Sequence, residues 1–384
     1  MKKTLISSFV ILAFLISCAQ QEVKKTEKQP PEEKKISQAL LDYSLGLEHF
    51  KQHDYSEALP NFEKALKESS GFVDACVGAA KCFCGIGKFQ AAESLYLDFL
   101  NKNPGATKAR VALANLYAMR KMNDKAKKTF EIAAKRDSTE PYVWDNYASF
   151  LNKVGQKDTA LKYWERAYSL DPKNKEIAFR LGAAYVAAGQ GKKAVSLLES
   201  VKEIIPDDID TRLKLAEAYT DAKMYSKAVE EYKFVISKIP NYVSVIIKLG
   251  NDYESLKKYS LAQEQYLHAL EIEPKNLSAY YYLINLNIFK LKNYTAAEKY
   301  LNSALEINKK DEILWNLRGD TYFYAGIKEM KKENYRSAIK KLTKALAYYN
   351  AALNFAKSTN WKKYAKTGIK RSKKYLAQAK DLLW

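Results

Sequence analysis

The chain has 384 residues, 47% of them hydrophobic, which is enough to bury a large core and argues against a mainly disordered protein. It contains 28 tyrosines but only 14 glycines and 9 prolines, so we expect short loops and extensive packing of helix on helix. Its formal net charge of +20 favours an anionic partner, whether nucleic acid, anionic lipid or acidic protein.

Residues 1–17 have the pattern of a secretory signal peptide. Two lysines precede an apolar run, Leu5–Ile16, that is too short to span a bilayer as a mature helix. The run ends in Leu-Ile-Ser-Cys, which resembles the bacterial lipobox. The resemblance implies cleavage before Cys18 and lipidation of its thiol. The alternative is an ordinary cysteine in an ordinary signal peptide.

The residues after Cys18 bear on where the protein is held. Ala19 and Gln20 lack the aspartate that resembles an inner-membrane retention signal, so we expect an outer-membrane lipoprotein on either the periplasmic or the surface side. Export makes nucleic acid the least expected partner. Residues 18–36 are charged and almost free of apolar side chains, which predicts a disordered tether after the lipidated cysteine.

From residue 37 onward the sequence repeats with a period of 34 residues. Four prolines mark this period: Pro172, Pro206, Pro240 and Pro274. In the same phase, a small residue stands at the eighth position of seven repeats: Gly46, Ala80, Ala114, Ala148, Gly182, Ala216 and Gly250. Each period has two apolar stripes at helical spacing, such as Trp144, Tyr147 and Leu151 followed by Ala160, Trp164 and Ala167. This pattern resembles the tetratricopeptide repeat (TPR).

The resemblance implies an all-α fold, a right-handed superhelical solenoid of about nine TPR hairpins with a C-terminal capping helix. Residues 37–310 are predicted to form eight repeats, the eighth shifted by one residue with Asn285 at the small position. Residues 311–384 are predicted to form a longer, divergent repeat and a basic capping helix. The extra length is seven residues between Gly319 and Ala338.

Few residues are suited to catalysis or metal binding. Gly-rich strings near Gly87 and Gly189 lack the spacing of a phosphate-binding loop and are predicted to be left-handed helix ends, together with Gly155. His49 and His53 could in principle bind zinc with Cys82 and Cys84, although residues two apart on a helix point to different sides. We predict no enzyme, no cofactor and no metal site, and buried thiols at the cysteines after Cys18.

Polar residues are expected to line a concave groove. The family resemblance places this groove at positions two, five, six, nine, twelve and thirteen of each first helix. Position six carries polar side chains in four successive repeats, and position nine adds two asparagines. We call these six residues the polar row and predict that they bind a peptide: Asn115, Asn146, Arg180, Lys214, Lys248 and Asn251.

The polar row partly resembles the carboxylate-gripping groove of co-chaperone repeats. Asn115, Asn146 and Arg180 fall on its polar positions, whereas Val111 and Glu176 stand where that groove has lysines. Recognition of a terminal aspartate motif is therefore in doubt, and an extended or acidic peptide stays open.

A simpler interpretation is that the row is only solvated surface. Lys214 could pair with Asp210 four residues earlier on its own helix, and Arg180 could pair likewise with Glu176. Lys248 has Ser244 at that spacing and is predicted to lack such a partner.

The sequence thus predicts a membrane-anchored protein-binding adaptor or assembly scaffold of the bacterial cell envelope, with a partner peptide in the concave groove. Its partners would be other envelope proteins or peptides, acidic ones included, and the membrane through Cys18. The alternative is a glycan- or lipid-binding protein that uses a Tyr-rich groove, with Tyr280, Tyr281 and Tyr282 as its best feature.

Overall fold

The computed structural model describes residues 31–383, so Cys18 and the signal peptide lie outside the described residues. Within that range the chain forms helices and no strand, which confirms the all-α class. None of these helices is both long and apolar enough to cross a membrane. The right-handed sense of the predicted superhelix remains a prediction.

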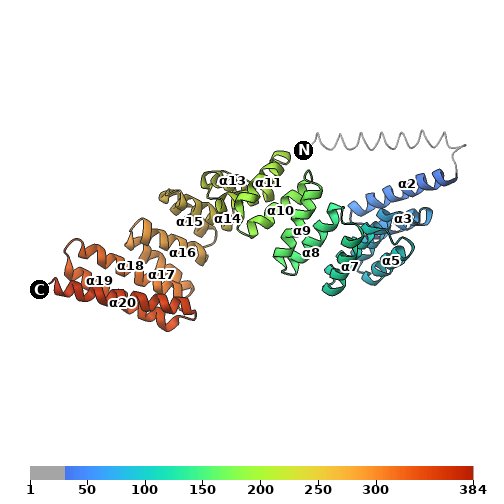
Figure 1. Cartoon of the computed structure of the whole chain (residues 1–384). Coiled ribbons are helices and arrows are strands. Elements are labelled where there is room, and N and C mark those ends of the chain that lie inside the picture. The colour runs from blue at the N-terminus through green and yellow to red at the C-terminus, as the bar shows by residue number, and fades with distance from the viewer. Residues whose placement is uncertain (1–30, 384) are drawn as a thin grey trace. The chain divides into compact units, whose positions relative to one another are not determined.

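The chain divides into two compact units, one ending at Ile177 and the other beginning at Ala178, and each is built from helical hairpins (Figure 1). The helices of the first unit are α2 (Pro31–Lys51), α3 (Tyr55–Glu68), α4 (Val73–Gly85), α5 (Phe89–Lys102), α6 (Thr107–Met119), α7 (Asn123–Arg136), α8 (Pro141–Lys153) and α9 (Lys157–Leu170). Since α2 starts at Pro31, the predicted end of the tether at residue 36 is corrected. Proline is favoured in a first helical turn, where its missing N–H is not needed.

The second unit holds all but the first turn of α10 and every later helix. These are α10 (Lys175–Ala187), α11 (Gly191–Ile204), α12 (Ile209–Asp221), α13 (Tyr225–Lys238), α14 (Val243–Ser255), α15 (Tyr259–Ile272), α16 (Leu277–Asn285), the π-helical turn η2 (Leu286–Lys290), α17 (Tyr294–Ile307), α18 (Glu312–Met330), α19 (Tyr335–Phe355) and α20 (Thr359–Asp381).

Small residues at the eighth repeat position let the two helices of a hairpin approach closely. A Cβ added to Gly46 would lie 2.8 Å from the ring of Phe62, and one added to Gly250 would lie 2.5 Å from the ring of Tyr266. Both distances are shorter than ordinary contact. The small residue and the large one therefore interlock, as the repeat pattern predicts.

The end of each first helix is left-handed. Gly87, Gly155 and Gly189 have φ angles of 77°, 85° and 67°, which confirms the predicted helix ends. The corresponding residues of other repeats adopt the same conformation without being glycine, with φ between 53° and 62°: His53, Lys121, Lys223, Lys257, Lys292 and Glu333. The geometry therefore belongs to the repeat and not to glycine alone.

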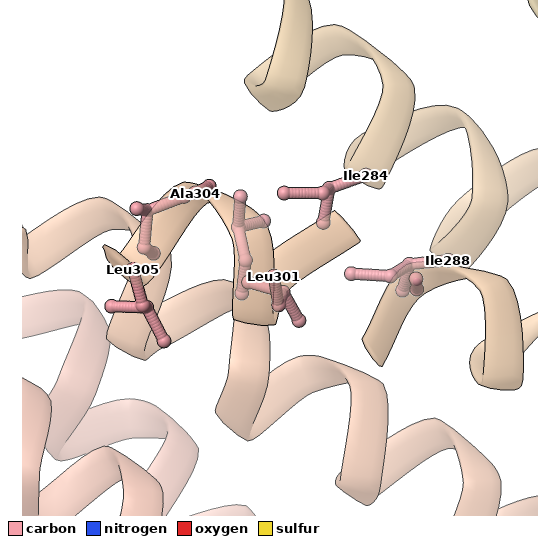
Figure 2. Close-up of a cluster of buried hydrophobic side chains, with 8 residues drawn as sticks. Ile284, Ile288, Leu301, Ala304 and Leu305 are labelled. Atoms are coloured by element: carbon pink, nitrogen blue, oxygen red, sulfur yellow. The ribbon is translucent and has the colours of Figure 1, made fainter. Parts of the chain in front are cut away.

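A π-helical turn accounts for the shifted register of the eighth repeat. Ile284, 34 residues after Gly250, is fully buried, so the register is still regular there and Asn285 is not the small position. The extra residue enters at η2, where the wider turn accommodates it. Figure 2 shows the result: Ile284 and Ile288 pack with Leu301 of α17 in one buried cluster.

The last three helices form a longer module. α18 has 19 residues, against 13 in α14, and α19 has 21. The ring of Tyr349 is fully buried between Gly319 of α18 and Gly368 of α20, where added Cβ atoms would lie 2.6 and 2.5 Å from it. Its hydroxyl donates to the buried Asp320 at 2.6 Å. The outer side of α20 carries exposed lysines: Lys362, Lys363, Lys366, Lys370 and Lys373.

Candidate functional site

The first unit contains a groove of about 670 Å³ that is lined mostly by the first helices of its hairpins. Most of its lining residues occupy the groove positions that the family resemblance implies. The lining residues are Phe50, Tyr55, Val77, Lys81, Cys84, Gly85, Tyr96, Lys108, Val111, Ala112, Asn115, Leu116, Met119, Tyr142 and Asn146.

The groove is lined by apolar residues and two lysines. Val77 and the exposed side chain of Met119 supply apolar surface, and the buried Val111 lies beneath them in the lining. Lys81 and Lys108 are its charged residues, and no acid lines it. Lys108 forms an ion pair with Asp74. Lys81 is exposed and has no ion pair among residues 31–383, so its charge is available to a ligand.

Two members of the polar row meet in this groove. The side-chain amide of Asn115 on α6 donates to Oδ1 of Asn146 on α8 at 2.9 Å. Nδ2 of Asn146 in turn donates to the carbonyl oxygen of Tyr142 at 2.7 Å. The amides thus link position nine of one repeat to position six of the next and face the groove.

In the second unit Lys214 and Lys248 converge on a carboxylate that the sequence analysis missed. Nζ of Lys214 lies 2.7 Å from Oε2 of Glu217, and Lys248 pairs with Oε1. Burial alone would raise the pKa of Glu217, but hydrogen bonds from both lysines hold it below its usual range. The prediction that Lys248 lacks a partner is wrong, and Lys214 pairs with Glu217 rather than with Asp210.

The same geometry explains why this partner was missed. Glu217 occupies position nine, 31 residues before Lys248, as Asn115 does relative to Asn146. A search for acids four residues away on one helix cannot find a contact between neighbouring repeats.

The remaining members of the row are held separately. Asn251 accepts a hydrogen bond from the hydroxyl of Tyr266 at 2.7 Å, within its own hairpin. Arg180 lies on α10 and also has an interaction partner in the chain. The row is thus divided between the two units.

The three neighbouring tyrosines of α16 do not share one surface. Tyr281 donates its hydroxyl to Asp311 at 2.7 Å, and Tyr280 packs against the cluster around Ile284. Tyr282 is exposed and stacks on Tyr266 at 5.6 Å between ring centroids. They do not form the single aromatic platform that the alternative function would use.

A larger and more polar cavity of about 940 Å³ lies in the second unit. It is lined by α17, the extended end of α18 and one lysine of α19. Five lysines and three glutamates occur among its lining residues: Lys292, Lys299, Lys328, Lys332, Lys341, Glu298, Glu306 and Glu329. Lys341 and Glu329 pair at 3.1 Å.

No group of three or more metal-ligating side chains occurs in the described part of the chain. His53 contacts the hydroxyl of Tyr55 at 3.1 Å. Cys76 and Cys82 are buried thiols, as predicted, and burial raises the pKa of Cys76 to about 12. Cys84 is only half-buried and lines the groove. Burial therefore disfavours the thiolate form of Cys76.

Two family models, both described as "Tetratricopeptide repeat", match the chain. One matches residues 49–98 and 152–210, and the other matches residues 247–312. Together with the helical hairpins these matches identify the chain as a tetratricopeptide-repeat protein. No curated protein matches it.

Several solved structures are similar to parts of the chain. MamA from Desulfovibrio magneticus RS-1 is 19% identical with a TM-score of 0.41, over 44% of this chain and 96% of its own. PilF of Pseudomonas aeruginosa is 17% identical with a TM-score of 0.45, over 55% and 96%. YrrB, described as a TPR protein with an unusual peptide-binding site, is 23% identical with a TM-score of 0.40, over 48% of this chain and 95% of its own.

Proposed function

We propose that this TPR protein is a lipid-anchored adaptor or scaffold of the bacterial cell envelope that holds an extended segment of a partner protein in the groove of its first unit. The family matches support a protein-interaction role. The observation that carries the choice of site is the groove, with its apolar lining residues, two lysines and no lining acid.

These residues favour one kind of peptide. An apolar side chain of the peptide would lie on Val77 and Met119, and a neighbouring carboxylate would accept hydrogen bonds from Lys81. The linked amides of Asn115 and Asn146 can bind the peptide backbone. The ligand class is therefore an extended peptide with an acidic residue beside an apolar one.

The anchor and location are part of the proposal. The signal peptide pattern and the lipobox-like residues before Cys18 support lipidation, and Ala19 and Gln20 favour the outer membrane. The proposal assigns no catalytic step, no cofactor and no nucleic acid to the chain, because adaptor function needs only binding.

Capture of partners from envelope extracts, followed by titration of tiled peptides from them, tests the groove. We expect Lys81→Ala to weaken peptide binding about tenfold, as for a lost hydrogen bond to a charged group. Lys363→Ala on α20 is the matched control and should bind normally. Bound peptide should also protect Cys84 from alkylation. Unchanged affinity for Lys81→Ala would remove the groove as the site.

One observation favours a second function. The cavity of the second unit is lined by five lysines against three glutamates, together with hydroxyl and amide side chains and with Tyr294 and Tyr322. This excess of positive charge suits an anionic sugar. Titration with oligogalacturonate separates the two functions. Binding that is lost in Lys299→Ala and kept in Lys81→Ala would favour the glycan function.

A further inference from the structure

The first helix of the chain presents an apolar face to solvent. Four large side chains of α2 are exposed: Ile36 by 57%, Leu40 by 53%, Leu41 by 50% and Leu45 by 39%. We call these four residues the α2 face. Ile36 and Leu40 are four residues apart, as are Leu41 and Leu45, so the four side chains lie on one broad side of the helix that covers about half of its circumference. A contiguous apolar patch on a protein surface marks an interaction site.

The repeat shows that two positions of this face, those of Leu41 and Leu45, are normally covered. Leu41 and Leu45 occupy positions three and seven of the first repeat. In later repeats the residues at these positions are between 0% and 3% exposed: Ala75, Ala79, Ala109, Leu113, Val143, Tyr147, Thr211, Leu215, Val245 and Leu249. The second helix of the preceding hairpin buries them. For example, Phe130 of α7 stacks on Tyr147 with ring centroids 5.1 Å apart.

No helix among the described residues covers the corresponding side of α2. The helix packs on α3 and α4, which lie on its other side. Residues 19–30 read AQQEVKKTEKQP and contain Val23 as their one large apolar residue, too few to cover the face. The opposite chain end differs, because α20 presents exposed lysines, as a terminal helix of a repeat array should.

We propose that the α2 face docks on the surface of the phospholipid bilayer that holds the lipid anchor, an inference that rests on the proposed lipidation of Cys18. Twelve residues separate Cys18 from Pro31. Fully extended, this segment spans at most about 45 Å, and as a flexible chain about 20 Å. The anchor therefore keeps α2 close to the membrane at all times.

The composition of the face favours a bilayer over a second copy of the chain. Between Ile36 and Leu45, the exposed residues of α2 outside the α2 face are Ser37, Gln38 and Ser44. All exposed residues of this stretch are therefore uncharged. A broad apolar face of this kind suits a helix lying in the membrane interface. A stable protein dimer buries about 20–30 residues on each side, many more than this face offers.

Fluorescence quenching by brominated lipid tests this docking. The full chain is purified from membranes, its acylation is measured by mass spectrometry, and it is reconstituted into vesicles of brominated phosphatidylethanolamine and phosphatidylglycerol. Ser44→Trp places a reporter beside the α2 face, and Lys363→Trp is the matched reporter on α20. We expect the fluorescence added by Ser44→Trp to be quenched, and that added by Lys363→Trp to be unaffected.

A second variant tests whether the quenching depends on the α2 face. Adding Leu41→Glu and Leu45→Glu to Ser44→Trp should abolish the quenching, while acylation and helical content stay unchanged because both sites are exposed. An acylated Ser44→Trp chain that is quenched no more than the parent overturns the docking and leaves the anchor intact. Absence of acyl chains on Cys18 overturns both the proposed lipid anchor and the docking. Cross-linking of α2 to α2 between copies, without quenching, also overturns the docking and makes a second copy the occupant.

Discussion

At the scale of single residues, the repeat requires conformations that most side chains avoid. The fifteenth position of a repeat is left-handed whether it holds a glycine, as Gly155 at 85°, or a residue with a side chain, as Lys121 at 59°. A left-handed residue with a side chain costs about 1–2 kcal/mol relative to glycine. The helix ends of this protein therefore differ in strain although they have one geometry.

Gly155→Ala should destabilise the first unit by about 1–2 kcal/mol, because alanine resists a positive φ angle. Gly105→Ala is the matched control, since Gly105 also lies in a turn with open space around its Cα but does not have a positive φ. Urea melts followed by circular dichroism measure both variants. Equal midpoints for the two would show that the left-handed end carries no strain.

A buried carboxyl of the second unit gives stability a distinct pH dependence. Asp252 is almost fully buried, and burial raises its pKa to about 6 although a hydrogen bond from Thr220 opposes the rise. In the unfolded chain its pKa is about 4. The folded state thus holds a proton that the unfolded state releases, so stability falls as pH rises from about 4 to 6.

Asp252→Asn should remove the loss of folding stability between about pH 4 and 6, because asparagine does not ionise. At pH 7.5 the variant should be more stable than the parent by about 1–3 kcal/mol, and at pH 4 the two should be nearly equal. Urea melts at both pH values are the measurement. A variant less stable than the parent at pH 7.5 would mean that the carboxylate is stabilised by its surroundings.

At the scale of elements, each hairpin depends on small residues where helices cross. Ala160 of α9 is fully buried in such a crossing. A large side chain at this position has no free volume to occupy, because the core is close-packed.

Ala160→Trp should therefore destabilise the first unit by about 1–3 kcal/mol through overpacking. Lys162→Trp introduces the same side chain at an exposed site of the same helix and should change stability little. The comparison uses the midpoints of urea unfolding. If both variants unfold like the parent, the assigned repeat register is wrong.

The elements also show how far sequence reasoning reaches. The 34-residue period predicted the hairpins and their crossing points, because that period is imposed by local packing that recurs. It did not predict η2, since a single extra residue can be accommodated at several places in a helix and only packing around Ile284 and Ile288 selects one. It also missed Glu217, whose contact with Lys248 joins two repeats.

The sequence predicted only part of the candidate site, because the repeat gives the groove positions but not which of them the groove uses. Groove positions follow from the repeat, so Asn115 and Asn146 were found. Lys81 and Lys108 were missed, although both stand at groove positions, because the search followed one row of polar residues along position six.

At the scale of the whole molecule, the proposed anchor determines where the adaptor acts. Cys18→Ser should abolish incorporation of a fatty-acid analogue, because the acceptor thiol is absent. Metabolic labelling of the parent and the variant measures this directly. Equal labelling of both proteins would rule out Cys18 as the lipidation site.

The central claim is that the groove of the first unit binds the partner, and site-specific photo-cross-linking tests it most directly. A benzophenone amino acid replaces Met119, which lines the groove and is exposed, or Lys363 on α20 as the control. We predict that irradiated cells yield a partner adduct at position 119 that is weakened by Lys81→Ala, and none at position 363. Adducts at position 363 without any at position 119 would contradict the claim.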